Sequence, residues 1–197
     1  MRLLLTGSTG GIGSALCAEA RARGVDVVTL DRATFDSDSR LIGLVENVSR
    51  GSIDSLVFAT GVCPVKPLAL MTDEVFAETF RVNCGLFLRV MRTLVAEKLY
   101  NPAGCRVMAI SSVSATEGWP GGAAYCASKG ALSALCRALD AELAPKKIRV
   151  KAIEPRYVKT KMFDACAGRM GVSATEARLP EDLAKEILEW VECDENR

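Results

Sequence analysis

The chain has 197 residues, of which 49% are hydrophobic and 25% are charged, and its formal net charge is +1. This composition is ordinary for a globular protein, and the length suits one domain, residues 1–197, with a substantial core. A net charge so close to zero gives no sign of the excess positive charge that binding to nucleic acid or to an anionic membrane requires. Histidine is absent, which excludes Ser-His-Asp chemistry and every histidine-containing metal site.

Eight cysteines are spread along the chain, and no two of them form a Cys-x-x-Cys pair. Several fall inside predicted strands or helices, and the sequence indicates neither a signal peptide nor a membrane-spanning run. We therefore expect reduced cysteines in a cytoplasmic protein. We expect no metal site, because the cysteine spacing does not support a structural zinc.

The first strand is expected at Arg2 to Thr6, and the glycine-rich turn Gly7-Ser8-Thr9-Gly10-Gly11-Ile12-Gly13 follows at once. Apolar residues then recur at near-helical spacing as far as Gly24, a predicted helix C-cap. Glycines between a strand and a helix let the backbone approach a pyrophosphate, whose charge is met by the helix N-terminus. The turn therefore predicts a dinucleotide site, and the alternative is a plain flexible turn. A phosphate P-loop is excluded because no Gly-Lys-Ser/Thr follows.

The second strand, Val25 to Leu30, ends at Asp31. An acidic residue at that tip accepts hydrogen bonds from both ribose hydroxyls of an adenosine and repels a 2′-phosphate, so NAD is favoured over NADP. Arg32 is the competing determinant, since its guanidinium would instead receive that phosphate. A solvated loop aspartate is the plain alternative. Before the next strong strand there is room for a brief strand at Thr34-Phe35 and one helix, about Ser39 to Ser49.

A strand at Asp54 to Ala59 runs into the tight turn Thr60-Gly61, at the edge where open parallel sheets bind ligands. A long helix follows, capped by Thr72 and reaching about Lys98. Its predicted apolar stripe comprises Phe76, Phe80, Phe87, Val90 or Met91, and Leu94. Asn83 falls within that stripe, where an unpaired amide would cost about 1–3 kcal/mol. It is therefore either a satisfied core residue or a functional one.

Two more strands are expected at Arg106 to Ile110 and at Arg149 to Ile153, with a long helix, Ala123 to Ala144, between them. The segment Lys161 to Leu179 is interpreted as loop or short helix, and Pro180 opens the last helix. Because strands alternate with helices, we predict an α/β fold with a three-layer, doubly wound parallel sheet (a Rossmann fold) of about six strands.

The long helix Ala123 to Ala144 carries Tyr125-Cys126-Ala127-Ser128-Lys129 near its start. A four-residue step puts Tyr125 and Lys129 on one helix face, about 5–6 Å apart at the β-carbons. The ammonium would favour the phenolate, so the pKa of Tyr125 is expected to fall and its hydroxyl to exchange protons. Taken alone, this pair is more simply an ordinary surface i,i+4 pair, and it gains weight only from the motifs around it.

Together these motifs resemble the short-chain dehydrogenase/reductase family, over nearly the whole chain. The glycine turn matches the family's cofactor motif, and Asn83 matches its helix asparagine. Ser112, Tyr125 and Lys129 match its catalytic serine and Tyr-x-x-x-Lys, with 13 positions from serine to tyrosine as is common in the family. Pro155 to Thr160 resembles its Pro-Gly-x-x-x-Thr loop, and residues 180–184 resemble the opening of its late helix.

The resemblance implies an NAD(P)-dependent oxidoreductase that interconverts a small-molecule secondary alcohol and a ketone by hydride transfer. Tyr125 would exchange a proton with the substrate oxygen, Lys129 would also hold the nicotinamide ribose, and Ser112 would fix the carbonyl. Asn83 would position a water that joins Lys129 to solvent. The expected cofactor contacts are Gly7, Ser8, Thr9, Gly11, Ile12, Gly13, Asp31, Arg32, Ala59, Thr60, Gly61, Asn83, Tyr125, Lys129, Pro155, Val158 and Thr160.

The chain also departs from the family pattern. Phe58-Ala59-Thr60-Gly61 replaces the usual Asn-Asn-Ala-Gly, Arg156 replaces the glycine after Pro155, and the usual final strand is missing after the last helix. The family pairs its long helices into a four-helix bundle, so a homodimer through the helices that contain Asn83 and Tyr125 is expected, and the missing strand argues against a tetramer. The alternative function is a cofactor-binding sensor or scaffold with little turnover.

Overall fold

The structure is a computed structural model that describes residues 1–30 and 48–193. Five parallel strands form one sheet in the order β2-β1-β3-β4-β5. The strands are β1 (Arg2–Thr6), β2 (Asp26–Leu30), β3 (Ser55–Phe58), β4 (Cys105–Ile110) and β5 (Ile148–Ile153). The chain runs outward from β1 to β2 and then returns to the other side of β1 at β3, so the strand order reverses between β1 and β3.

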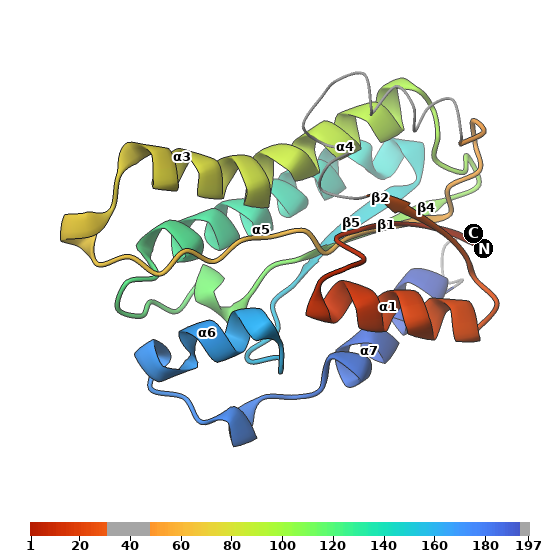
Figure 1. Ribbon diagram of the computed structural model, residues 1–197. Helices are drawn as coiled ribbons and strands as arrows, with labels where there is room; N and C mark the ends of the chain where they lie inside the picture. The colour runs from red at the N-terminus through yellow and green to blue at the C-terminus, as the bar shows by residue number, and fades with distance from the viewer. Residues whose placement is uncertain (31–47, 194–197) are drawn as a thin grey trace.

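Helices cover both faces of this sheet (Figure 1). One face carries α3 (Asp73–Phe80), α4 (Leu86–Ala96) and α5 (Ala123–Leu143), and the other carries α1 (Gly11–Ala22) and α7 (Pro180–Glu192). Helix α6 (Lys161–Met170) lies at the left of Figure 1, toward the carboxyl edge of the sheet. Short 3₁₀ turns are η2 (Leu68–Leu70), η4 (Val113–Ala115), η5 (Ala144–Lys146) and η6 (Ala174–Glu176).

The predicted doubly wound α/β fold is therefore confirmed. Five strands are present in the described residues, where about six were expected. The expected sixth strand at Thr34-Phe35, most of the helix at Ser39 to Ser49, and both Asp31 and Arg32 lie outside the described residues. The strand boundaries agree with the sequence predictions to within a residue or so, because each apolar run is bounded by turn residues.

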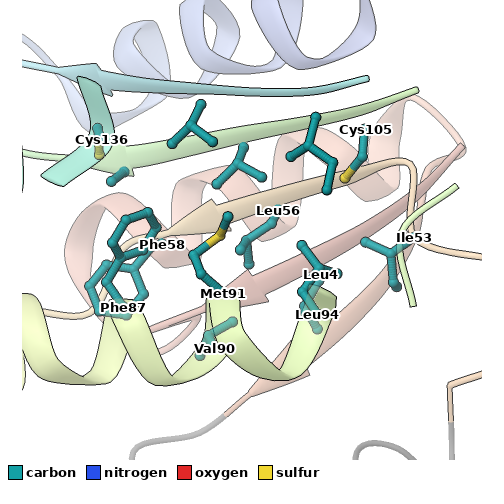
Figure 2. Packing of buried hydrophobic residues seen from close by; sticks show 14 of the residues in the cluster. Leu4, Ile53, Leu56, Phe58, Phe87, Val90, Met91, Leu94, Cys105 and Cys136 are labelled. Atoms are coloured by element: carbon teal, nitrogen blue, oxygen red, sulfur yellow. The ribbon is translucent and has the colours of Figure 1, made fainter. Parts of the chain in front are cut away.

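Strand β1 shows why the sheet needs helices on both sides. Leu3 and Leu5 face one cluster with α1 and α7, whereas Leu4 faces a second cluster with α4 and α5. Figure 2 shows the second cluster, in which Phe58 of β3 lies against Phe87 of α4 with ring centroids 5.3 Å apart. Because β1 is buried on both faces, its side chains need not alternate between apolar and polar. This explains the unbroken apolar run at the start of the chain.

The long helix expected from Thr72 to about Lys98 is present, but it is not uniform. Thr72 caps α3 as predicted, with its Oγ1 accepting from the Val75 amide at 3.3 Å. The segment η3 (Arg81–Gly85) between α3 and α4 is π-helical, and such a turn inserts an extra residue into the helical repeat. The predicted stripe is confirmed on the α4 side but is wrong at Phe76, whose exposed fraction is 44% and which lies on α3, where Thr79 is the only buried residue.

Helix α6 resolves the segment Lys161 to Leu179, which the sequence left open between loop and short helix. Thr160 caps it, accepting from the Phe163 amide at 3.1 Å, and Gly171 ends it in the left-handed conformation at φ 69°. Across the described residues, none of the helices has the length and apolar composition that crossing a bilayer requires.

Candidate active site

A cavity of about 490 Å³ opens at the carboxyl edge of the sheet, beside the point where the strand order reverses. Its walls come from the glycine turn, the segments that follow β3 and β4, the start of α5, and the stretch between β5 and the end of α6. These segments are far apart in the sequence. They meet here because parallel strands all end at the same edge of a sheet, which is where such folds bind ligands.

The glycine turn is built from close backbone contacts that leave no room for a side chain. Gly7 has φ 69°, and a Cβ on it would lie 2.8 Å from the Ala59 carbonyl group. A Cβ on Gly13 would lie 2.0 Å from the Gly7 oxygen, and one on Gly11 would lie 2.5 Å from Cγ2 of Thr160. The three glycines therefore allow β1, the segment after β3 and the start of α6 to pack together, which a plain flexible turn would not require.

The N-terminus of α1 faces the cavity, with Gly11, Ile12 and Gly13 in its wall. No side chain caps this helix, since its N-cap residue is Gly10. The first amides of an uncapped helix are hydrogen-bond donors without an acceptor inside the helix, and the helix dipole adds a favourable potential for an anion. A pyrophosphate group fits this position by both its charge and its acceptor oxygens.

A pair of threonines holds the segment that follows β3, where the sequence lacks the asparagine typical of related chains. Thr6 Oγ1 accepts a hydrogen bond from the Ala59 amide at 3.2 Å and lies 3.0 Å from Thr60 Oγ1, which donates to it. Thr6 is fully buried, and Thr60 nearly so. These bonds fix Ala59 to Gly61 against the end of β1.

Asn83 is a satisfied core residue. Its Oδ1 accepts from the Val62 amide at 2.8 Å, and its Nδ2 donates to the Val62 carbonyl at 3.0 Å and to Ser128 Oγ at 2.8 Å. The side chain is fully buried and lies outside the cavity wall. Both amide hydrogens are used within the protein, so the side chain ties the segment after β3 to α5.

Ser112, Tyr125 and Lys129 all reach the cavity, although they come from two elements. The Ser112 side chain is close enough to the Tyr125 hydroxyl to lower the pKa of that phenol. Lys129 Nζ lies 5.6 Å from the centre of the Tyr125 ring and donates to the Ile110 carbonyl at 2.7 Å. The predicted side-by-side placement of Tyr125 and Lys129 is thereby confirmed.

The predicted fall in the Tyr125 pKa is wrong for this structure. Burial raises the pKa of Tyr125 above its ordinary value, and the neighbouring thiols of Cys63 and Cys166 raise it further. Burial also lowers the pKa of Lys129 from 10.5 to about 8. Removing both groups from water disfavours their charged forms, and this desolvation outweighs the attraction of an ammonium for a phenolate.

Most of the predicted site residues line this cavity. They are Thr9, Gly11, Ile12, Gly13, Ala59, Thr60, Gly61, Ser112, Tyr125, Lys129, Pro155, Val158 and Thr160. Gly7 and Asn83 lie behind the wall and position it, Ser8 is not part of it, and the structure does not describe Asp31 or Arg32.

The side of the cavity beyond Tyr125 was not predicted from the sequence. It is lined by Cys63, Trp119, Tyr157, Phe163, Cys166 and Met170. Trp119 is held by a hydrogen bond from its Nε1 to Ser114 Oγ at 3.2 Å, and its ring centre lies 6.3 Å from that of Tyr125. No pattern in the sequence marks these residues, because they come from turns and from a short helix without a strong periodicity.

Arg156, which replaces a glycine of the family pattern, lies at the rim of the cavity. Its guanidinium pairs with Glu117 Oε1 at 2.9 Å and lies 5.7 Å from the Tyr157 ring. The Arg156 side chain is 64% exposed, so the ion pair is well solvated. It therefore joins the loop before α5 to the segment after β5 across the rim without being buried.

In the described part of the chain, no cluster of side chains has the composition to hold a metal ion.

The strand order of the α/β sheet reverses beside a glycine turn, and serine, tyrosine and lysine side chains lie in the same cavity. These features together are those of a dinucleotide-dependent oxidoreductase. The sequence comparison agrees with this class. The family model described as "Enoyl-(Acyl carrier protein) reductase" matches residues 14–183. The chain belongs to the short-chain dehydrogenase/reductase family, whose members bind NAD(P).

Characterised relatives are reductases with different substrates. The chain is 30% identical to "L-xylulose reductase" of Bos taurus over 181 residues, which is 83% of this chain and 74% of that protein. It is 30% identical over 139 residues to "Carbonyl reductase [NADPH] 2" of Sus scrofa, covering 71% of this chain and 55% of the other. A crystal structure of "3-ketoacyl-(acyl-carrier-protein) reductase from Brucella melitensis complexed with NADH" has the same fold, with 23% identity, a TM-score of 0.80, and coverage of 96% of this chain and 90% of that one.

Proposed function

We propose that this oxidoreductase interconverts a secondary alcohol and a ketone by hydride transfer, with Tyr125 as the acid/base group. The observation that carries the proposal is the presence of Ser112, Tyr125 and Lys129 in one cavity with the uncapped N-terminus of α1. A cofactor-binding protein without turnover needs the glycine turn but does not need all three of these side chains.

The cofactor would supply or accept the hydride, and the protein would hold the substrate oxygen and move a proton. Ser112 would donate a hydrogen bond to that oxygen and stabilise the charge that develops on it. Tyr125 would give its phenolic proton to the same oxygen when a ketone is reduced. Because burial raises the pKa of Tyr125, the phenol is protonated at neutral pH, which is the state that reduction requires.

Lys129 would act beside Tyr125 and not as a proton donor to the substrate. Its ammonium is buried, with an exposed fraction of 5%, and reaches the cavity between the Ile110 carbonyl and the Tyr125 ring. From there it would bind the nicotinamide ribose and hold positive potential next to the phenol. Asn83 would contribute by fixing Val62 and α5, and a water near Lys129 would complete the path of the proton to solvent.

For the cofactor we propose NAD(H) over NADP(H). Asp31 at the end of β2 supports the proposal, since a carboxylate there binds ribose hydroxyls and repels a 2′-phosphate. Relatives include an enzyme named for NADPH and a structure with NADH, so the family alone does not decide. Fluorescence titration with NADH and NADPH tests the proposal, and tighter binding of NADPH would assign the choice to Arg32. Asp31→Ala should narrow the difference.

We also propose a cytoplasmic homodimer. The cytoplasmic location rests on the eight cysteines, all of which are free thiols, as a reducing compartment would keep them. The dimer would form through α4 and α5, which cover the same face of the sheet (Figure 1). Exposed apolar side chains at Phe76 and Leu88 near that face support it. Light scattering that gives a monomer or a stable tetramer would contradict it.

The decisive experiment is a screen of NADH and NADPH oxidation against ketones and keto-sugars, run beside direct measurement of cofactor binding. Turnover of at least one carbonyl compound that is lost in Tyr125→Phe supports the enzyme. Tight cofactor binding without turnover of any compound would favour the alternative, a cofactor-binding sensor or scaffold.

A further inference from the structure

Two cysteines that are 103 residues apart in the sequence meet at the wall of the cavity. Cys63 Sγ, in the segment after β3, lies 3.5 Å from Cys166 Sγ on α6. Both residues line the cavity, and all eight cysteines of the chain are free thiols. Among the described residues, these are the only two cysteine sulfurs in hydrogen-bond contact with each other.

The pair lies beside the proposed acid/base group. The thiols of Cys63 and Cys166 are both close enough to Tyr125 to raise the pKa of its phenol, and Cys126, one position along α5, does the same to a smaller extent. Cys63 is partly exposed to the cavity, whereas Cys166 is buried at 3% exposed. A reagent that enters the cavity therefore meets Cys63 first.

Helix α6 depends on few other contacts. Phe163 and Cys166 are its only buried side chains, and its remaining positions are exposed or half-exposed. The Phe163 ring lies 5.8 Å from that of Tyr157, and Thr160 caps the helix at the edge of the glycine turn. A covalent bond at Cys166 would therefore attach the helix to the segment after β3, across the side of the cavity that lies beyond Tyr125.

We propose that Cys63 and Cys166 form a dithiol site that small disulfides oxidise to an intramolecular disulfide, which fixes α6 over the cavity and slows substrate turnover. The two sulfurs must approach from 3.5 Å to about 2.05 Å, a shift of about 1.5 Å. Two side-chain rotations and the lightly packed α6 accommodate a movement of this size. The crosslink does not depend on the proposed function, whereas its effect on turnover does.

The chemistry is two successive thiol–disulfide exchanges. The Cys63 thiolate attacks a small disulfide, RSSR, which breaks its S–S bond, forms a mixed disulfide and releases one thiol after protonation. The Cys166 thiolate then attacks Cys63 Sγ and releases the second thiol. The protein dithiol loses two electrons and two protons, and RSSR gains them as two RSH. Burial and the neighbouring Cys166 raise the pKa of the Cys63 thiol, so its thiolate fraction is small at neutral pH and the exchange should become faster as the pH rises.

The test uses the full chain with hydroxyethyl disulfide, the oxidised form of 2-mercaptoethanol. Peptide mapping should find Cys63 joined to Cys166, with two small thiols released for each crosslink formed. NADH fluorescence should show that the cofactor still binds, because neither Cys63 nor Cys166 belongs to the glycine turn. Ketone reduction should fall roughly tenfold to 10²-fold, the expected result of misplacing a reacting group by about 1 Å, and should return with dithiothreitol.

Variants separate this site from general oxidation. Cys63→Ser and Cys166→Ser should form no crosslink, and the activity of each, relative to its own untreated sample, should be insensitive to the oxidant. Cys126→Ser is the matched control and should keep both the crosslink and the sensitivity. The proposal is overturned if the parent chain yields only mixed disulfides, if another cysteine pair is joined, or if Cys63→Ser is inactivated as readily as the parent. If no ketone is reduced, the proposed function fails, and peptide mapping still decides the crosslink.

Discussion

The cavity has two walls that are made in different ways. One, the backbone wall, consists of Thr9 to Gly13 with Ala59 to Gly61, and Gly7 supports it from behind, where glycines allow main chains to touch. The other, the side-chain wall, consists of Trp119, Tyr157 and the inner face of α6. The backbone wall is defined by close atomic contacts that admit almost no substitution. The side-chain wall is held by ring contacts, one exposed ion pair and the two thiols, and not by close contacts between main chains.

This difference predicts that changes to the backbone wall affect folding and cofactor binding, whereas changes to the side-chain wall affect the choice of substrate. Tyr125 lines the same cavity, and its replacement by phenylalanine should leave folding and cofactor binding nearly intact and affect chiefly the chemical step. The four predictions below begin there and are ordered from the largest expected effect to the smallest.

Tyr125→Phe removes only the hydroxyl, and packing of the ring should be unchanged. A positioned acid/base group contributes roughly 10²–10⁴-fold in rate, so turnover of any carbonyl substrate should fall by about that factor. Steady-state kinetics and NADH titration on the same sample measure both quantities. Tyr100→Phe is the matched control, because Tyr100 is half-buried and lies outside the cavity wall.

Two companion variants sharpen this result. Lys129→Ala should lose rate and cofactor affinity together, because Lys129 would serve both, and Ser112→Ala should lose rate chiefly. If Tyr125→Phe keeps most of the parent activity, its acid/base role is wrong, whatever the other two variants do.

Gly13→Ala tests the backbone wall. The new Cβ would lie 2.0 Å from the Gly7 oxygen, so the turn must open. Overpacking of this kind costs about 1–3 kcal/mol of unfolding free energy, and cofactor affinity should fall with it. Gly168→Ala on α6 is the control, because a Cβ there meets nothing within 4 Å and alanine favours helix by up to about 1 kcal/mol. If the two variants have equal unfolding midpoints in urea, the backbone wall tolerates an added Cβ as well as α6 does, and the proposed difference between the walls is wrong.

The buried ammonium of Lys129 predicts a pH dependence of stability. Burial lowers its pKa from 10.5 to about 8, so between these pH values the unfolded chain binds more protons than the folded one. Stability contributed by this residue should therefore rise with pH across that window, by at most about 1.4 kcal/mol per pH unit. The measurement is the difference in unfolding free energy between the parent and Lys129→Met as a function of pH. A difference that stays constant, or that falls with pH, would show that Lys129 is not desolvated.

Arg156→Ala tests the side-chain wall and should have the smallest effect on folding. The Arg156–Glu117 ion pair is largely exposed, and such pairs contribute about 0–1 kcal/mol. The unfolding midpoint should barely move, while the relative kcat/KM values for anionic and neutral ketones should change, since the guanidinium is at the rim. Glu117→Gln is the matched change on the other side of the pair. If the relative kcat/KM values are unchanged in both variants, Arg156 and Glu117 do not contribute to substrate selection.

Much of this organisation is predictable from the sequence because it depends on local rules. Apolar runs bounded by turns specify the strands, and a glycine turn between strand and helix specifies the backbone wall. The convergence of Ser112 with Tyr125 follows from parallel topology, which brings the end of β4 and the start of α5 to the same edge. A four-residue step on one helix placed Lys129 next to Tyr125.

What the sequence left undecided depends on packing between distant segments. The spacing of Tyr125 and Lys129 predicted a lowered phenol pKa, but only the tertiary structure shows how deeply both groups are buried, and desolvation reverses the shift. Asn83 was equally a core or a functional residue until Val62 and Ser128 were seen to satisfy its amide. The contact between Cys63 and Cys166 has no signal in the sequence at all, because side chains 103 residues apart are brought to 3.5 Å only when α6 packs against the edge of the sheet.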